Sequence, residues 1–117
     1  MHLVRTVGDA SPREITCGTM RELTSSKDFP GMDIVHVTIG SETKRHYHKR
    51  LTEVYFVLKG SIVMEVDGKK EGLKEGGMVM IFPNTEHKAW KASKGSAEIL
   101  VICCPPWTKE DEVLTET

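Results

Sequence analysis

Residues 40–60, with the sequence GSETKRHYHKRLTEVYFVLKG, constrain the fold of this chain more than any other stretch. They place His46 and His48 two positions apart, and Glu53 follows five positions later. Side chains alternate between the two faces of a β-strand, so both imidazoles point the same way if this segment is extended. Glu53 begins EVYFVLK, whose β-branched and aromatic residues predict a second strand. A turn over residues 49–52 would bring Glu53 back beside the two histidines.

His87 is a fourth residue of the same kind, and it follows a predicted turn at Pro83 and Asn84. Two or three neutral imidazoles with one carboxylate form a ligand set for a first-row divalent metal. One His-x-His pair alone is weak support, because a single histidine on a strand is more often a surface or hydrogen-bonded core residue. The combined spacing G-x5-H-x-H-x4-E-x6-G, followed by G-x5-P-x3-H, is much more specific.

These two spacings resemble the two sequence motifs of the cupin superfamily. The first motif is matched at all of its fixed positions, which are Gly40, His46, His48, Glu53 and Gly60. The second is matched at Gly77, Pro83 and His87, and it departs at Thr85 and Lys91, where the family has glycine and asparagine. The resemblance implies a small single-domain metal-binding cupin over residues 1–117. The metal ligands that it implies are His46, His48, Glu53 and His87.

The implied cofactor is one divalent transition metal. Three imidazoles and one carboxylate suit Mn, Fe, Ni, Co, Cu or Zn, whereas Ca and Mg prefer shells made only of oxygen. A six-coordinate ion held by four side chains would keep two positions for water, dioxygen or substrate.

The remaining sequence predicts an all-β fold independently of the motifs. Short runs of strand-forming residues recur every eight to twelve residues, with turn signals such as Asp67-Gly68 between them. The resemblance specifies the architecture as a double-stranded β-helix, the jelly-roll barrel of cupins. Residues 1–13 are expected to form an edge strand or a strand exchanged with a partner. Residues 108–117 are expected to form a frayed polar tail.

Strand alternation also predicts which side chains surround the metal. Tyr55 shares a face with Glu53 and is the expected catalytic residue, as a hydrogen-bond donor to a ligand of the metal. For any one of the apolar pocket residues, barrel core is the simpler interpretation. Lys91 would hold an anionic substrate if it faces inward and would be solvated if it faces outward. The expected pocket residues are Val57, Ile62, Met64, Met80, Phe82 and Lys91.

Composition argues against several classes of function. The net charge is −1 and both signs are mixed along the chain, which indicates no surface for nucleic acid or an anionic membrane. The longest apolar run, residues 99–104, is too short to span a bilayer, and the N-terminus lacks the apolar centre of a signal peptide. A cytoplasmic protein that binds a small-molecule substrate or ligand is therefore expected. Residues 54–58 are apolar on both faces, which favours a homodimer.

The three cysteines do not suggest a disulfide framework, because their number is odd and Cys103 and Cys104 are adjacent. Burial of at least one of this pair as a small hydrophobic residue is expected. A soft-metal or redox role for the pair is the alternative, although no C-x-x-C motif is present.

Three functions are compatible with these features. An oxygenase-type enzyme ranks first, because a redox-capable metal with open positions would bind a small organic substrate and dioxygen together. A metal-dependent isomerase or epimerase of a sugar-like carbonyl compound is the second, with the metal as Lewis acid. The expected apolar lining counts against this second function, which needs several basic or amide groups aimed inward. An oxygenase needs a general base or a redox metal, and no general base is apparent in the sequence. A non-catalytic cupin that binds a small molecule is the third, since the fold alone does not decide between them.

Overall fold

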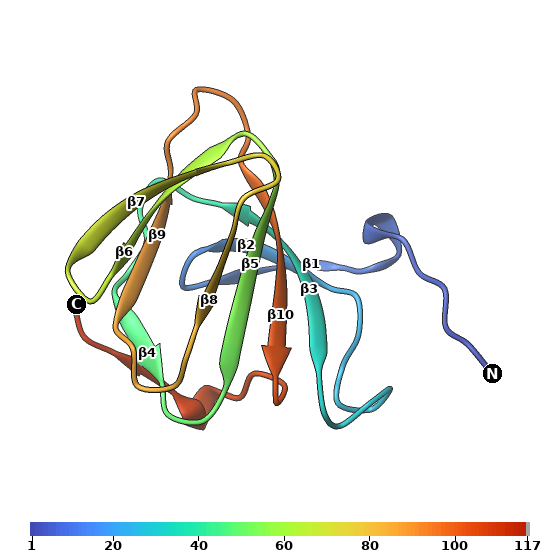
Figure 1. Cartoon of the computed structure of the whole chain (residues 1–117). Coiled ribbons are helices and arrows are strands. Elements are labelled where there is room, and N and C mark those ends of the chain that lie inside the picture. Colours follow the sequence, from blue (N-terminus) through green and yellow to red (C-terminus); the bar gives the residue numbers. More distant parts are fainter. Residues whose placement is uncertain (117) are drawn as a thin grey trace.

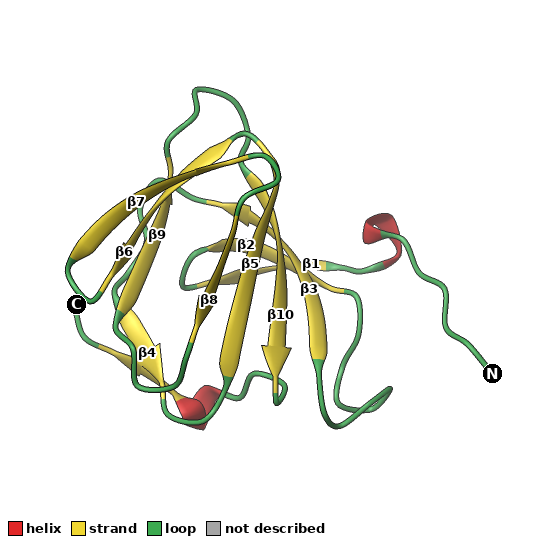
Figure 2. Cartoon of the chain, viewed as in Figure 1, coloured by secondary structure: helices red, strands yellow, loops and turns green. Residues whose placement is uncertain are grey.

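The structure is a computed structural model that describes residues 1–116, and within them antiparallel strands form two sheets (Figures 1 and 2). The first sheet contains, in spatial order, β1 (Pro12–Ile15), β2 (Gly18–Glu22), β3 (Asp33–Ile39), β10 (Glu98–Cys104), β5 (Thr52–Lys59) and β8 (Met78–Ile81). The second contains β11 (Glu112–Leu114), β4 (His46–His48), β9 (His87–Lys91), β6 (Ser61–Val66) and β7 (Lys69–Lys74). Two short 3-10 helices, η1 (Val7–Asp9) and η2 (Lys109–Asp111), complete the described part.

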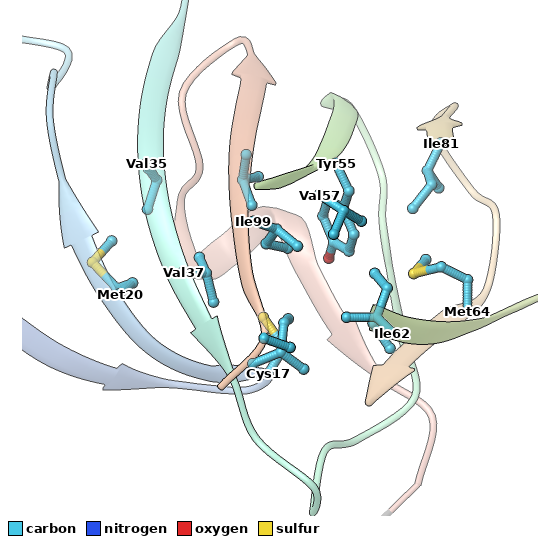
Figure 3. Close-up of a cluster of buried hydrophobic side chains, with 14 of the residues drawn as sticks. Cys17, Met20, Val35, Val37, Tyr55, Val57, Ile62, Met64, Ile81 and Ile99 are labelled. Carbon is cyan, nitrogen blue, oxygen red and sulfur yellow. The ribbon is translucent and has the colours of Figure 1, made fainter. Parts of the chain in front are cut away.

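The two sheets face each other and enclose the core, so the predicted all-β jelly-roll barrel is confirmed (Figure 1). Tyr55, Ile62, Met64 and Ile99 are almost fully buried between the sheets (Figure 3). Burial of one large apolar side chain contributes about 1.5–3 kcal/mol, so this cluster accounts for much of the stability of the barrel. No helix within residues 1–116 is long and apolar enough to cross a membrane.

The register between β5 and β8 corrects the prediction that Met80 and Phe82 face inward. Tyr55 faces the core and lies opposite Val79, whereas Val54 lies opposite Met80. Residues directly opposite each other share a face, so the inward side of β8 carries Val79 and not Met80. Met80 is 47% exposed and Phe82 is 62% exposed. Their segment is apolar at every position, so alternation alone could not identify the buried side.

Of residues 1–13, which were predicted to form an edge strand, only the last two belong to one. Strand β1 begins at Pro12 and pairs with β2, at the edge of the first sheet. Before it, residues 1–11 contain the short helix η1 and lie to one side of the barrel (Figure 1). Exchange of this segment with a partner stays a prediction.

The prediction of a frayed tail at residues 108–117 is wrong for its central part, which we call the C-terminal strap (residues 109–114). The strap contains η2 and β11, and β11 pairs with β4. The Asp111 carboxylate accepts hydrogen bonds from the backbone N–H groups of Arg50 (2.8 Å) and Leu51 (3.1 Å). The Lys49 N–H donates to the Asp111 carbonyl oxygen at 3.0 Å. These contacts order a polar segment that lacks enough apolar residues to signal its packing; Thr117 lies outside the described residues.

Replacement of Asp111 tests this anchoring. Asp111→Ala should lower the free energy of unfolding by about 2 kcal/mol, because two backbone N–H groups lose a charged acceptor. Chemical denaturation measures the change. Glu110→Ala is the matched control, since Glu110 is the exposed neighbour on the same strap. Equal stability of the two variants would contradict a structural role for Asp111.

The predicted homodimer also has a surface that can be tested. The outer face of β5 and β8 exposes Phe56, Leu58, Met78, Met80 and Phe82. If a second copy covers this face, Phe82→Glu should shift the protein toward monomer in light scattering, while Phe29→Glu, at an exposed site in the loop before β3, should not. A wild-type protein that is monomeric at micromolar concentration would remove the prediction.

Candidate metal centre

Three neighbouring strands bring the four predicted ligands together at one end of the barrel. Strand β4 carries His46 and His48 on its inner face, and His46 lies directly opposite His87 of β9. Glu53 lies at the start of β5, immediately after the turn at residues 49–51. All four side chains are buried. The short strand and the tight turn therefore place them as the alternation predicts.

The ligand atoms of these four residues lie within 4.8 Å of one another. Glu53 Oε1 is 3.3 Å from His87 Nε2 and 3.9 Å from His48 Nδ1. The imidazole rings of His46 and His87 are also close, with centroids 4.3 Å apart. This arrangement could hold a single ion between three imidazoles and one carboxylate.

Two backbone carbonyl groups orient the histidine rings. His46 Nδ1 donates to the Lys44 carbonyl oxygen at 2.9 Å, and His87 Nδ1 donates to the Thr85 carbonyl oxygen at 2.9 Å. A carbonyl can only accept, so Nδ1 carries the proton in both rings and Nε2 presents its lone pair to the centre. Thr85 departs from the family motif, but it contributes through its backbone and preserves this contact. These outer partners could not be named from the sequence.

Unsatisfied buried atoms show that the residues fit a metal ion. Glu53 Oε1 and His87 Nε2 are buried and have no hydrogen-bond partner among residues 1–116. Leaving such an atom unpaired costs about 1–3 kcal/mol, more when the group is charged. One divalent cation would satisfy both atoms, which face each other. The donor set of three nitrogens and one oxygen matches a transition metal.

The surroundings of His46 and Glu53 favour the protonation states that a metal requires, whereas those of His48 favour its protonated form. Burial and the nearby His87 lower the pKa of His46, which therefore stays neutral near pH 7. Burial would lower the pKa of His48, but the nearby carboxylates of Glu112 and Glu53 outweigh burial and raise it. Burial would raise the pKa of Glu53, but the close contact with His87 and the other nearby histidines outweigh burial and lower it, so the carboxyl stays ionised.

Glu112 is a fifth polar residue at the centre, and the sequence analysis missed it. Its Oε1 lies 3.7 Å from His46 Nε2 and 3.6 Å from His48 Nε2. Its Oε2 accepts a hydrogen bond from Thr16 Oγ1 at 3.1 Å. Glu112 follows Glu53 by 59 positions in a segment without a recognisable pattern, so no spacing signal could have revealed it.

A cavity of about 460 Å³ extends from the centre along β1, β2 and β3 and is bordered by the strap. Most of its wall is apolar, as the sequence analysis expected, although several ionisable side chains also line it. Apolar wall residues include Ile15, Met20, Val35, Val37 and Val101. Ionisable wall residues beyond the predicted ligands include Arg13, Glu14, Glu22, Asp33, Lys109 and Glu112.

The predicted pocket residues do not line this cavity. Val57, Ile62 and Met64 are buried in the barrel core, which was their simpler interpretation. Met80 and Phe82 are exposed on the outer face. Lys91 lies opposite Ile62 at the end of β9 away from His87, and it is half-buried. The pocket prediction failed because the cavity opens toward β1–β3, which carry no motif residue.

Tyr55 does line the cavity, and its ring centroid is 6.3 Å from that of His87. Burial, followed by the charge of Glu53, raises the pKa of the phenol well above its ordinary value. Tyr55 is therefore a hydroxyl donor at neutral pH and cannot serve as a base. Its predicted role as a donor is compatible with this position and stays a prediction.

The buried cysteines are neutral thiols. Cys103 donates a weak hydrogen bond to Glu53 Oε2 at 3.8 Å, while Cys104 is exposed on the other face of β10. Burial raises the pKa of Cys17 to about 12 and raises that of Cys103 still further, in both cases with a contribution from the charge of Glu53. Neither buried thiol is therefore a thiolate ligand at neutral pH.

Metal titration tests the centre. The chelator-treated protein should bind one equivalent of a divalent transition metal, and His87→Ala should weaken binding by more than about 100-fold, beyond the usual loss of an outer-shell partner. His2→Ala is the control outside the cluster. Affinity should fall as the pH is lowered, because protonated histidine cannot bind a metal and the raised pKa of His48 starts this competition at a higher pH than for an ordinary histidine. Equal binding by both variants would contradict the site.

Comparison with known sequences agrees with this geometry. The family model described as Cupin domain matches residues 33–103. The uncharacterized protein MJ1618 of Methanocaldococcus jannaschii is 34% identical over 82 residues, which cover 68% of this chain and 64% of that protein. The alignment thus spans slightly less than two thirds of that relative's length.

Solved structures share the fold. A protein from Planctomyces limnophilus matches with a TM-score of 0.85 and 22% identity, over 96% of each chain. The nucleoside dehydratase Pac13 of Streptomyces matches with a TM-score of 0.84 and 15% identity, over 99% of this chain and 92% of that one. Because the family model covers most of the barrel and all four ligand residues, this chain belongs to the cupin family.

Proposed function

We propose that this cupin is a metal-dependent enzyme that isomerises or epimerises a small oxygen-bearing molecule by proton transfer. The observation that carries the proposal is the position of Glu112, whose Oε1 lies within 3.7 Å of the Nε2 atoms of two ligand histidines and borders the cavity. A carboxylate at this position could act as the general base that the sequence analysis did not identify. For this reason we rank proton-transfer chemistry above the oxygenase reaction, which the sequence analysis had ranked first.

The protein holds Glu112 in a defined orientation. Thr16 occupies one carboxylate oxygen, which leaves Oε1 free toward the centre. The neighbouring Asp111 ties the strap to the turn between β4 and β5. A base fixed from both sides loses little entropy when it accepts a proton from a bound substrate.

Each residue then has a separate task. A divalent ion bound by His46, His48, Glu53 and His87 would polarise a carbonyl or hydroxyl oxygen of the substrate. Glu112 accepts a proton from the adjacent carbon and returns it. Tyr55 donates a hydrogen bond to a substrate oxygen. The apolar residues of the cavity wall limit access of water to this end of the cavity.

An oxygenase remains the second candidate. Three imidazoles and one carboxylate suit iron or manganese, and one part of the cavity wall, formed by Val35, Val37 and Val101, is apolar enough for dioxygen. A binding cupin without turnover is the third candidate, because a cavity of about 460 Å³ accommodates a small ligand whether or not it reacts.

Replacement of Glu112 distinguishes these candidates. The metal-loaded protein should incorporate solvent deuterium into a member of a panel of hydroxy-carbonyl compounds, followed by NMR, without consuming dioxygen. Glu112→Gln should reduce the rate by about 100-fold or more while the metal content is retained, because only the base is lost. Glu110→Gln is the matched control on the exposed side of the strap.

Other outcomes would assign a different function. Metal-dependent dioxygen consumption that is unaffected by Glu112→Gln would favour the oxygenase. Tight binding of a panel member with neither deuterium exchange nor dioxygen consumption would favour the binding cupin.

A further inference from the structure

A second group of carboxyls lies in the same cavity, away from the four ligands. Asp33 begins β3 and Glu22 ends β2, and Glu22 lies directly opposite Val35. Residues 33 and 35 share one face of β3, so both carboxyl side chains are on the inner face. Both residues line the cavity that also contacts His46, His48 and Glu53.

Asp33 is the less satisfied of the two. It is only 3% exposed, and its Oδ1 has no hydrogen-bond partner within residues 1–116. Burial, followed by the charge of Glu22 and a hydrogen bond with it, raises the pKa of Asp33 to about 7. A buried carboxyl beside a second carboxyl needs either a proton or a cation.

The part of the chain that the structure describes does not provide that cation. The ion pairs formed by its lysines and arginines involve Asp28, Glu65, Glu98 and Glu116, and none involves Glu22 or Asp33. Arg13 and Lys109 also line the cavity, but both are exposed and neither forms an ion pair with either carboxyl. The two carboxyls therefore face the cavity without a counter-charge from the protein.

The ladder of the first sheet fixes how far this group lies from the metal centre. Asp33 is opposite Cys103 of β10, and Cys103 is opposite Glu53 of β5. Two strand spacings separate Asp33 from Glu53, which is about 10 Å between backbones. Val35 and Val101 lie opposite each other, two residues along their strands from Asp33 and Cys103, and form an apolar stretch of the cavity wall. One small molecule can therefore contact both ends of the cavity.

We propose that Glu22 and Asp33 form a subsite that binds the protonated amine of the substrate, with the substrate's oxygen atoms at the metal centre. An ammonium group has three N–H donors and no acceptor, which suits two carboxyls that have no ion-pair partner among the described residues. A carboxylate or phosphate at this position would meet like charge. The substrate class is a small amine with carbonyl, carboxylate or hydroxyl oxygens several bonds away. The assignment of the oxygen end rests on the proposed function, whereas that of the amine end does not.

Matched ligands test the subsite without turnover. The probes are ε-aminocaproate, ε-hydroxycaproate and adipate, which differ mainly in the group at one end. Isothermal titration into zinc-loaded protein should show the amine binding about tenfold or more tightly than the alcohol, with the dicarboxylate weakest. Glu22→Gln should reduce the amine preference to near unity and leave affinity for the alcohol unchanged.

Two further variants keep the result specific. Asp33→Asn should have the same effect as Glu22→Gln. If Asp33→Asn does not fold, Glu22→Gln alone tests the subsite, because Glu22 is less buried. Glu14→Gln is the matched control, since Glu14 is an exposed acid on the same wall and should not alter the preference. The subsite would be overturned if the wild-type protein bound the amine and the alcohol equally. It would also be overturned if Glu14→Gln reduced the amine preference as much as Glu22→Gln does.

The same titration separates this inference from the proposed function. Glu112→Gln should retain the amine preference, because Glu112 lies at the other end of the cavity. An amine preference in a protein that never exchanges deuterium would support the subsite and count against the isomerase. Exchange with hydroxy-carbonyl compounds but no preference for amines would support the isomerase and overturn the subsite.

Discussion

The structure depends on the burial of four polar side chains that face one another. His46, His48, Glu53 and His87 are nearly inaccessible to solvent, and Glu53 Oε1 and His87 Nε2 have no hydrogen-bond partner among the described residues. A barrel without an ion at this position would leave those atoms unsatisfied at a cost of several kcal/mol. Folding and metal binding should therefore be coupled, because the ion compensates a cost that the β4–β9 ladder imposes.

The C-terminal strap connects this centre to the rest of the chain. Asp111 and Glu112 are adjacent and have different tasks, since the first accepts hydrogen bonds from the turn at residues 49–51 and the second faces the histidines. The same turn returns β5 so that Glu53 reaches the centre. Thr16 contacts Glu112 from the N-terminal hairpin. Segments from both ends of the described chain thus converge on one carboxylate, and disorder in the strap would disturb both the base and the ligand turn.

The ligands could be predicted from the sequence because their spacing is local. His46 and His48 share a face through simple alternation, and Glu53 follows after a turn of fixed length. The pocket could not be predicted in this way. The segment at residues 78–82 is apolar throughout, so only its pairing with β5 shows that Val79 faces inward and Met80 outward. Glu112 and Asp33 are placed by pairings with strands that are distant in sequence, and no local pattern specifies such pairings.

The distribution of charge along the cavity shows why its two ends differ. Glu53 and Glu112 lie beside three imidazoles, so a divalent ion bound there would offset their charge. Glu22 and Asp33 lie two strands away, too far to contact an ion bound at that centre, and water is largely excluded from Asp33. Holding a proton on Asp33 is one way to avoid two adjacent negative charges. A cationic ligand is the other, and it would release that proton on binding. The fold thus leaves one end of the cavity in need of a partner that the described residues do not supply.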